Sequence, residues 1–202
     1  GNPTVAPAWM PYDFVGLARA VDFFAPEAYG RIGDWEKVKP GWFTRAWARA
    51  VAPELPVLWA EFGYTVWNEP QNCPDPDRVA FAARFYDDFY RMAHASGANG
   101  TVCWWYPGGY RVGERSDYGI INPDGSWRPV TEVIRKWAPT MTAPRAQPRP
   151  DVWIEYDPDR LVFGLAGLYT ETSQAFWKAV AEGRTPGLKP RVAAETGGNE
   201  AL

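Results

Sequence analysis

The chain has 202 residues, a formal net charge of −3 and a hydrophobic content of 46%, which is typical of a globular protein with one sizeable core. Acidic and basic residues are mixed along the sequence, so no basic patch predicts nucleic-acid binding. The apolar runs fall short of the ~20 residues that a membrane span needs, and no targeting segment is visible.

Aromatic residues are unusually frequent, with 12 Trp, 10 Tyr and 10 Phe. Such rings fill protein cores, but they also stack on flat ligands such as sugar rings while offering directional hydrogen bonds. Cys73 and Cys103 lie in different predicted elements, so no disulfide framework is implied. The single His excludes a Cys2His2 zinc site, and neither a metal nor a cofactor is expected.

The first part of the chain alternates predicted helices and strands. Apolar residues at helical spacing predict a helix over 14–21, followed by a strand over 22–29 that runs into Gly30. A second amphipathic helix over 42–51 leads through Pro53 into an apolar strand that ends at Glu61.

A third unit has clear capping signals. Asp75 and Pro76 predict the N-cap and first position of a helix, and Gly97 predicts its C-cap. The following strand is predicted over 101–105. Alternating units of this kind favour a parallel sheet.

A last helix is predicted over 130–137, with Pro129 near its start and Pro139 just past its end. The proline-rich stretch 139–150 has the composition of a linker.

A separate segment is predicted after the linker. Residues 152–156 alternate like a strand, and Asp157-Pro158-Asp159 predicts a turn into a second hairpin arm over 161–163. A helix is predicted over 172–182, and the polar tail 196–202 should fray. The chain thus divides into a main part (1–138), the linker (139–150) and a small α+β accessory segment (151–202).

The main part holds three strand–helix units, whereas a closed (β/α)8 barrel needs eight and about 250 residues. Three parallel strands alone would leave unpaired edges and uncovered apolar helix faces. The remaining strands must therefore come from elsewhere, most simply from a preceding segment of the same gene product.

The strand that ends at Glu61 is the most informative motif. Residues 56–63 form an apolar run that closes with a carboxylate and Gly63. This pattern is typical of a buried barrel strand that delivers an acid to a cleft, because catalytic residues of (β/α)8 barrels lie at the carboxyl ends of the strands.

Several motifs in order resemble the C-terminal half of a clan A glycoside hydrolase. They are similar to the family 5 cellulases and mannanases, and to families 42 and 39, and the resemblance covers residues 10–138. The matching segments are 22–29, 58–63, 103–106 and 117–125. The resemblance implies the C-terminal portion of a TIM barrel, about strands 6–8, plus the small accessory segment.

The resemblance also implies a catalytic residue. Glu61 matches the nucleophile at the end of the seventh strand. Retaining glycosidases pair this nucleophile with an acid/base carboxyl ~5–5.5 Å away. In the family that residue belongs to an Asn-Glu-Pro motif at the end of strand four, which we expect outside this chain.

Further residues are implied to bind the substrate. Tyr29 matches a hydrogen-bond donor to the nucleophile, and Glu27 stands where the family usually has a histidine. Trp105 matches the tryptophan that forms the floor of the sugar site. Trp104, Tyr106, Trp67 and Glu114 complete the predicted substrate-binding set.

Trp67-Asn68-Glu69-Pro70 contains the Asn-Glu-Pro sequence of the acid/base motif, but it follows the strand that ends at Glu61 and not the fourth strand. Roughly 30 residues separate it from Trp105, which is room for one helix and not for the units between strands four and eight. Glu69 is therefore predicted to line a loop or the rim of the cleft.

Two other polar residues remain open to interpretation. Glu114 lies in the loop after the last strand, where it either holds sugar hydroxyls or forms a salt bridge. His94 is predicted to lie at the end of its helix, as a capping or surface residue.

The resemblance implies a retaining hydrolase of β-linked glycans or glycosides. The alternative is a carbohydrate-binding or scaffold fragment without catalysis. An aldolase or phosphate-binding isomerase is disfavoured, because no strand-end lysine and no Gly-rich phosphate loop appears. The predicted partners are a carbohydrate and the N-terminal half of the barrel, with neither nucleic acid nor membrane, and the predicted location is secreted or in a bacterial-type cell envelope.

Overall fold

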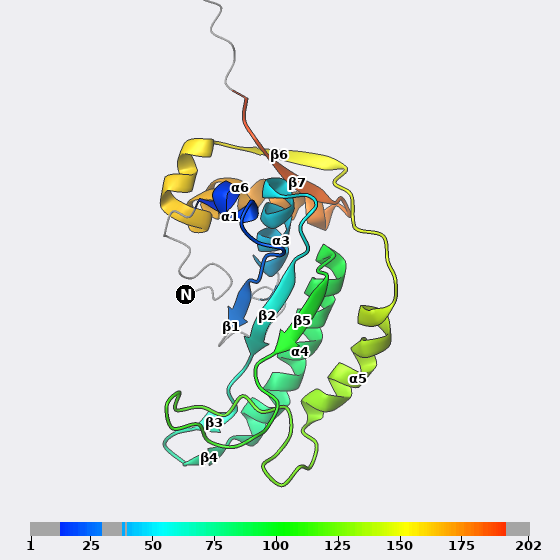
Figure 1. Cartoon of the computed structure of the whole chain (residues 1–202). Helices are drawn as coiled ribbons and strands as arrows, with labels where there is room; N and C mark the ends of the chain where they lie inside the picture. The colour runs from blue at the N-terminus through cyan, green and yellow to red at the C-terminus, as the bar shows by residue number, and fades with distance from the viewer. Residues whose placement is uncertain (1–12, 30–37, 39, 193–202) are drawn as a thin grey trace, which may run out of the picture.

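The computed structural model describes residues 13–29, 38 and 40–192 (Figure 1). Its centre is a three-stranded parallel sheet in the order β1-β2-β5, formed by β1 (Glu27–Tyr29), β2 (Leu58–Gly63) and β5 (Gly100–Cys103). Three main helices alternate with these strands along the chain: α3 (Pro40–Val51), α4 (Pro76–Ser96) and α5 (Pro129–Thr142). The predicted parallel strand–helix units are therefore confirmed.

Helix α4 begins and ends where its capping residues predict. The Asp75 carboxylate accepts the backbone N–H groups of Asp77 (2.9 Å) and Arg78 (3.3 Å), and Pro76 fills the first position, where no hydrogen bond is lost. Gly97 closes the helix with a φ of 78°, a left-handed conformation that glycine adopts without strain.

The other elements of the barrel part differ modestly from the predicted ranges. Helix α1 covers only Phe14–Ala18. Upstream of β1, a single bridge joins Phe24 to Val57, so the strand predicted over 22–29 is continuous only at its end. Helix α5 runs through Pro139 to Thr142, past the predicted end, because a proline this near the last turn disturbs few hydrogen bonds.

One face of the sheet packs on α4. A bulge between Trp59 and Phe62 lets both fully buried side chains point to this side. The Phe62 ring stacks on Phe89 of α4 with 3.9 Å between centroids, and Trp59 meets the same ring edge-on at 5.5 Å. These rings fix β2 against the helix.

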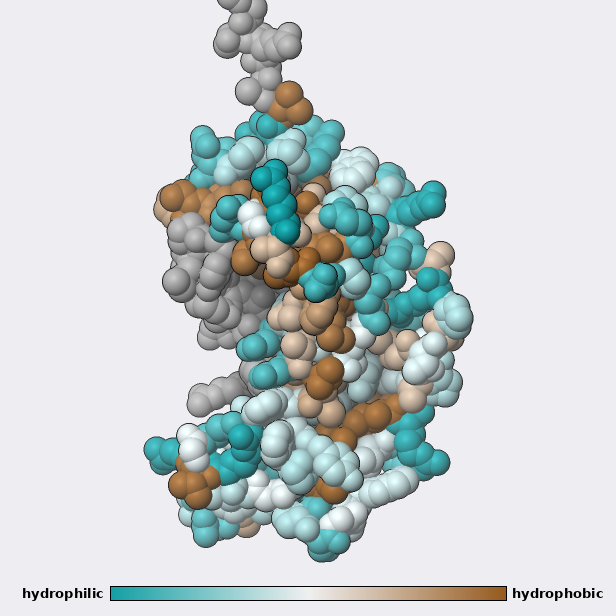
Figure 2. Space-filling model, viewed as in Figure 1, coloured by the Kyte–Doolittle hydropathy of each residue, from teal (hydrophilic) through white to brown (hydrophobic). Residues whose placement is uncertain are grey.

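The other face of the sheet is open in the described structure. Helix α4 lies behind the strands, α5 lies to its right, and no helix crosses in front of β1, β2 and β5 in this view (Figure 1). Val102 of the parallel strand β5 is 52% exposed, and Figure 2 shows hydrophobic colour running down the middle of the molecule over the sheet. In a closed barrel this face is the interior, which other strands cover.

The C-terminal segment is a β-α-β unit rather than a hairpin. Strand β6 (Val152–Tyr156) pairs in parallel with β7 (Pro186–Pro190), and η1 (Pro158–Phe163) and α6 (Gly164–Ala181) connect them. The predicted second hairpin arm is wrong: Asp157 accepts the N–H of Asp159 (3.0 Å) and so caps a helical turn that Pro158 begins. The predicted frayed tail lies outside the described residues.

This segment shares a hydrophobic core with the barrel helix α3. Phe43 of α3 meets Phe176 of α6 at 5.2 Å, and Trp47 meets Tyr156 of β6 at 5.2 Å, both edge-on. The unit lies at the end of the sheet where the strands begin (Figure 1). It is therefore remote from the strand ends that carry the predicted site.

The stretch between α5 and β6 is held against the body. The guanidinium of buried Arg45 donates to the Gly97 carbonyl (2.9 Å) and to Gln147 Oε1 (2.7 Å), while Arg145 donates to the Ala98 carbonyl. Burial lowers the pKa of Arg45 to about 10. The proline-rich composition of residues 139–150 predicted a linker. The contacts of Arg45 and Arg145 nevertheless fix the path of residues 145–147.

We expect Phe176→Ala to lower the free energy of unfolding by about 3–5 kcal/mol, because it removes a fully buried ring from the core shared with α3. Urea unfolding followed by circular dichroism measures the change. Val162→Ala, at a side chain 60% exposed in the same segment, should change the stability by less than about 0.5 kcal/mol. Equal effects of the two substitutions would contradict the shared core.

Candidate active site

Glu61 and Glu27 occupy paired positions on neighbouring parallel strands. The register joins Glu27 to Glu61 and Ala28 to Phe62. Ala28 and Phe62 are buried in the core that contains α4, and successive side chains of a strand point to opposite faces. The two carboxylates therefore face the open side of the sheet, near the carboxyl ends of their strands.

Tyr29 pairs with Gly63, two residues nearer the strand end than Glu27. Its backbone therefore lies beside β2, two residues beyond Glu61, and its side chain lies outside the described part. A Cβ at Gly63 would come within 2.1 Å of the Trp104 carbonyl oxygen. A glycine two residues after Glu61 is therefore required for the close approach of the chain that follows β5.

The predicted aromatic residues follow β5 directly. The Trp104 N–H donates to the Phe62 carbonyl (2.7 Å), and the Trp105 N–H donates to the Tyr118 carbonyl (3.1 Å). The peptide bond between the two tryptophans is cis. The Arg111 guanidinium lies over both rings, 4.9 Å and 4.4 Å from their centroids, in the geometry of a cation–π contact. Tyr106, by contrast, is mostly exposed.

Glu114 forms the predicted loop salt bridge. Its carboxylate lies 2.8 Å from Arg111 Nη1, and it accepts hydrogen bonds from Ser116 Oγ (3.2 Å) and from the indole of Trp104 (3.5 Å). These contacts tie the loop to a tryptophan at the strand end. By accepting the indole N–H, Glu114 orients the ring of Trp104.

The Asn-Glu-Pro sequence lies in a short antiparallel hairpin. Strands β3 (Trp67–Asn68) and β4 (Cys73–Pro74) pair with each other and not with the parallel sheet. Glu69 is therefore in a turn beyond β2, as the spacing predicted. Its carboxylate forms an ion pair with Arg115 Nε at 2.7 Å.

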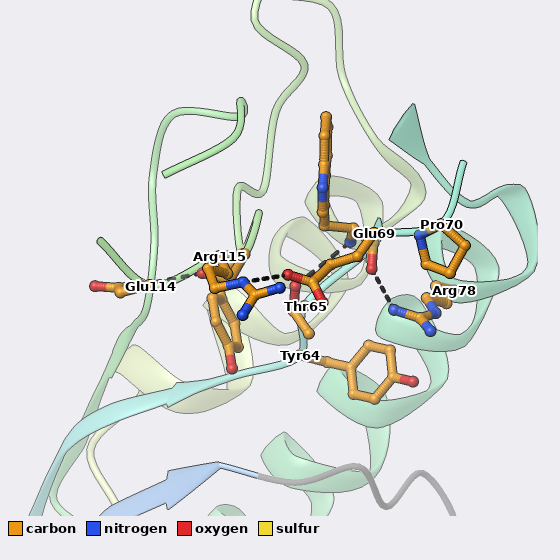
Figure 3. A pocket seen from close by; sticks show the side chains of 10 residues that line it. Tyr64, Thr65, Glu69, Pro70, Arg78, Glu114 and Arg115 are labelled. Carbon is orange, nitrogen blue, oxygen red and sulfur yellow. Dashed lines mark hydrogen bonds and ion pairs between the residues drawn. The ribbon is translucent and has the colours of Figure 1, made fainter. Parts of the chain in front are cut away.

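A cavity of about 660 Å³ lies between this hairpin, the loop after β5 and the start of α4. Its lining contains Trp67 and Glu114 from the predicted set, together with Tyr64, Thr65, Glu69, Pro70, Arg78, Arg115, Ser116 and Tyr118. Figure 3 shows Arg115 and Glu69 facing each other, with Glu114 directed away from this pair. Sequence reasoning missed Arg78 and Arg115, because nothing local connects them to residue 69.

A buried ion pair organises the loops around the strand ends. Arg128 donates from Nη1 and Nη2 to the two carboxylate oxygens of Asp117, at 3.0 and 2.7 Å. Both side chains are almost fully buried. Burial alone would raise the pKa of Asp117, but hydrogen bonds from Arg128 and the Gly119 N–H outweigh it and lower the pKa. Asp117 is thus a charged anchor in the folded protein.

The remaining candidates do not contribute to this site. His94 lies in the last turn of α4, as predicted, where burial and then Arg145 lower its pKa. Within the described ranges, no three His, Cys, Asp or Glu side chains gather as metal ligands. None of the helices described has the length and apolar character of a membrane span.

The parallel strands and the helices between them have the fold of part of a (β/α)8 barrel. No protein-family model and no curated protein matches the sequence. The similar solved structures are nevertheless glycoside hydrolases of family 5 and its clan A relatives.

Three of these structures show the extent of the likeness. A GH5_18 variant from Bifidobacterium longum subsp. longum, in complex with Manβ1-4GlcNAc, has a TM-score of 0.64 at 16% identity over 91% of this chain and 47% of its own. A GH5_18 variant from Streptomyces cattleya with the same ligand has a TM-score of 0.56 at 18% identity, over 90% and 43%. The exo-β-1,4-mannosidase Op5Man5 from Opitutaceae bacterium strain TAV5 has 0.52 at 17%, over 81% and 30%.

The chain thus spans less than half the length of the structures it matches, and its fold is that of the C-terminal part of their barrels. Because the likeness to the Bifidobacterium structure covers 91% of this chain, it extends beyond the barrel strands into the C-terminal β-α-β unit. That unit therefore belongs to the shared fold.

We expect Asp117→Asn to lower the free energy of unfolding at pH 7 by about 3–5 kcal/mol, because it leaves the Arg128 charge buried without a counter-charge. Urea unfolding measures the loss. Asp124→Asn, at an exposed carboxylate that bonds only to Ser126, is the control in the same loop and should cost about 1 kcal/mol or less.

The Asp117–Arg128 pair also makes the free energy of unfolding depend on pH. The folded-state pKa of Asp117 lies below its unfolded value, so its stabilising contribution is present above about pH 4 and is lost as the pH falls below that value. The stability difference between wild type and Asp117→Asn should therefore be constant from pH 7 to 5 and shrink below pH 4. A difference that persists unchanged at pH 2 would show that the charge is not its source.

Proposed function

We propose that this chain is the C-terminal half of a retaining β-glycoside hydrolase in which Glu61 is the nucleophile. The observation that carries the proposal is the position of Glu61 on the open face of β2, at the strand end and next to the tryptophans that follow β5. A half-buried carboxylate at this place in a (β/α)8 barrel reaches the cleft where substrates bind.

The proposed reaction has two steps. The Glu61 carboxylate attacks the anomeric carbon while the glycosidic C–O bond breaks and an acid protonates the leaving oxygen. Water, deprotonated by the same acid/base group, then attacks the glycosyl carbon and releases Glu61. A glutamate of the fourth barrel strand, outside this chain, supplies the acid/base.

The other predicted residues would position the sugar. Trp105 and Trp104 offer ring faces held in place by Arg111, and Tyr106 extends the aromatic surface. The Tyr29 hydroxyl would donate a hydrogen bond to Glu61. Glu27 lies one strand spacing away, about 4.8 Å between backbones, and would accept a sugar hydroxyl beside the nucleophile.

The substrate class follows from the aromatic surface and from the neighbours. Two similar structures hold Manβ1-4GlcNAc, and another is an exo-β-1,4-mannosidase. We therefore propose a β-linked glycan or glycoside as the substrate, with Manβ1-4GlcNAc as the first compound to assay.

The proposed partner is the N-terminal half of the barrel, on the same polypeptide or on another. The open face of the sheet supports this, because exposed apolar side chains such as Val102 need cover. The cleft would be complete only when the other strands are in place.

Glu61→Gln should reduce turnover to less than about a thousandth of wild type, because the amide keeps the shape of the side chain but not its nucleophilicity. The assay follows hydrolysis of Manβ1-4GlcNAc and other β-linked disaccharides by the complete barrel. Glu69→Gln is the matched control and should retain turnover within about tenfold. Loss of turnover only in Glu69→Gln would reverse the assignment of the two glutamates.

A 2-deoxy-2-fluoro glycoside with a good leaving group should trap the covalent intermediate on the complete barrel. Mass spectrometry of the peptides is expected to place the added sugar on Glu61, and the Glu61→Gln protein should remain unlabelled. Early products seen by NMR should keep the anomeric configuration. An inverted product would rule out the retaining mechanism.

A carbohydrate-binding fragment without catalysis is the second candidate. It is favoured by the cavity beside β3 and β4, because Glu61 does not line that cavity. This candidate predicts sugar binding with no turnover in any assembly that contains the other strands.

A further inference from the structure

Another cavity lies at the opposite end of the fold from Glu61. It is enclosed by α3, the end of α4, the chain at residues 148–150 and the start of β7, and its volume is about 130 Å³. These elements meet at the end of the sheet where the strands begin (Figure 1). The cavity is therefore remote from the proposed active site, and whatever binds in it does not take part in the proposed reaction.

Two arginines of α3 line this cavity, and its described lining contains no acidic residue. Arg45 and Arg49 lie one helical turn apart on the same face of the helix. Of the acidic residues next to the lining in sequence, Asp151 pairs with Arg184 at 3.2 Å. Exposed Glu54 forms no ion pair with either arginine of α3 within the described structure. The cavity thus carries a net positive charge.

The Arg45 guanidinium is buried without a carboxylate partner. The residue is only 4% exposed. Its Nε and Nη2 atoms donate to the Gly97 carbonyl and to Gln147 Oε1, and among the described residues Nη1 has no acceptor. Because buried charges in proteins are usually paired, a guanidinium of this kind at the wall of a cavity is suited to an anionic ligand.

Arg49 and Thr185 add further donors. Arg49 donates from Nη1 to the Pro53 carbonyl, so that Nε and Nη2 remain for a ligand in the described part of the chain. Thr185, just before β7, contributes a hydroxyl group to the lining. Burial, and then the charges of Arg49 and Arg145, lower the pKa of Arg45 to about 10, which still leaves it charged at neutral pH. A bound anion would relieve this repulsion between like charges.

The volume of the cavity limits the size of the ligand. About 130 Å³ is the space of roughly four water molecules, and it is below the ~300–1,000 Å³ of sites for drug-sized ligands and cofactors. Guanidinium groups bind phosphate-type oxyanions strongly, because their N–H groups form a fork that matches two oxygens of the ion. A small oxyanion therefore fits both the size and the charge.

From these observations we propose that the cavity binds a free tetrahedral oxyanion, inorganic phosphate or sulfate. Arg45 Nη1 and the N–H groups of Arg49 donate to its oxygens, and the Thr185 hydroxyl supplies a further hydrogen bond. The bound ion joins α3 to the C-terminal β-α-β unit, so it stabilises the contact between the barrel part and that unit. The proposal does not depend on the proposed function.

The test is titration of the full 202-residue chain with sodium phosphate at constant ionic strength, followed by calorimetry and by thermal melts. We expect saturable binding and a melting temperature at least about 2 °C higher in phosphate than in sodium chloride, because a ligand that binds only the folded state stabilises it. Phenyl phosphate, in which the phosphoryl group belongs to a larger molecule, should bind no more tightly than the free ion.

Three variants separate binding at this cavity from the effect of net charge. Arg49→Gln should raise the Kd for phosphate at least about tenfold, and Thr185→Val, which removes only a hydroxyl group, about threefold. Arg91→Gln removes the same charge from α4, where Arg91 pairs with Asp87 and Asp88, and should leave the Kd within about twofold. Circular dichroism in phosphate-free buffer verifies that each variant folds.

Four outcomes would overturn the proposal. The first two are the absence of saturable binding and a rise in melting temperature that sodium chloride reproduces at the same ionic strength. The third is an equal loss of affinity in Arg49→Gln and Arg91→Gln, which would show an effect of net charge alone. The fourth is binding of phenyl phosphate at least about tenfold tighter than that of phosphate, which would assign the site to a phosphoryl group of a larger ligand.

Discussion

The strand-end surface depends on the buried ion pair between Asp117 and Arg128. The Asp117 backbone accepts the Val66 N–H (2.7 Å) and donates to Thr65 Oγ1 (3.1 Å), so the pair fixes the chain that leaves β2. Arg128 also holds the Gly119 carbonyl at 2.7 Å and directly precedes α5. One desolvated charge pair thus joins the exits of two strands to the start of a helix. Because both side chains are buried, removing either partner leaves a buried charge without a counter-charge.

Sequence reasoning succeeded where the determining contacts are local. Asp75, Pro76 and Gly97 define α4 through hydrogen bonds within a few residues, and the apolar run before Glu61 predicted its strand. It failed where the partner is distant. Strand β6 pairs with β7 thirty or more residues later, and Asp157-Pro158-Asp159 suits a turn as well as a helix start, so local chemistry could not choose.

In the candidate site, too, features set by local sequence were predictable and features set by distant contacts were not. The positions of Glu61 near the end of β2 and of the tryptophans just after β5 were predictable, because parallel strands bring their carboxyl ends together. The cavity was not, because it joins Glu69 to Arg115, 46 residues apart, through two irregular segments. The Asn-Glu-Pro sequence lies in the β3–β4 hairpin, outside the parallel sheet, and its glutamate lines a cavity that sequence alone did not reveal.

The core shared between α3 and the C-terminal unit has a consequence for synthesis of the protein. The rings that cover Phe43 and Trp47, which are Tyr156 and Phe176, leave the ribosome more than a hundred residues after them. Helix α3 therefore cannot complete its packing while the strands beside it are already pairing. Its apolar face stays uncovered until the β6–α6–β7 unit has emerged, so folding at this end of the barrel waits for that unit.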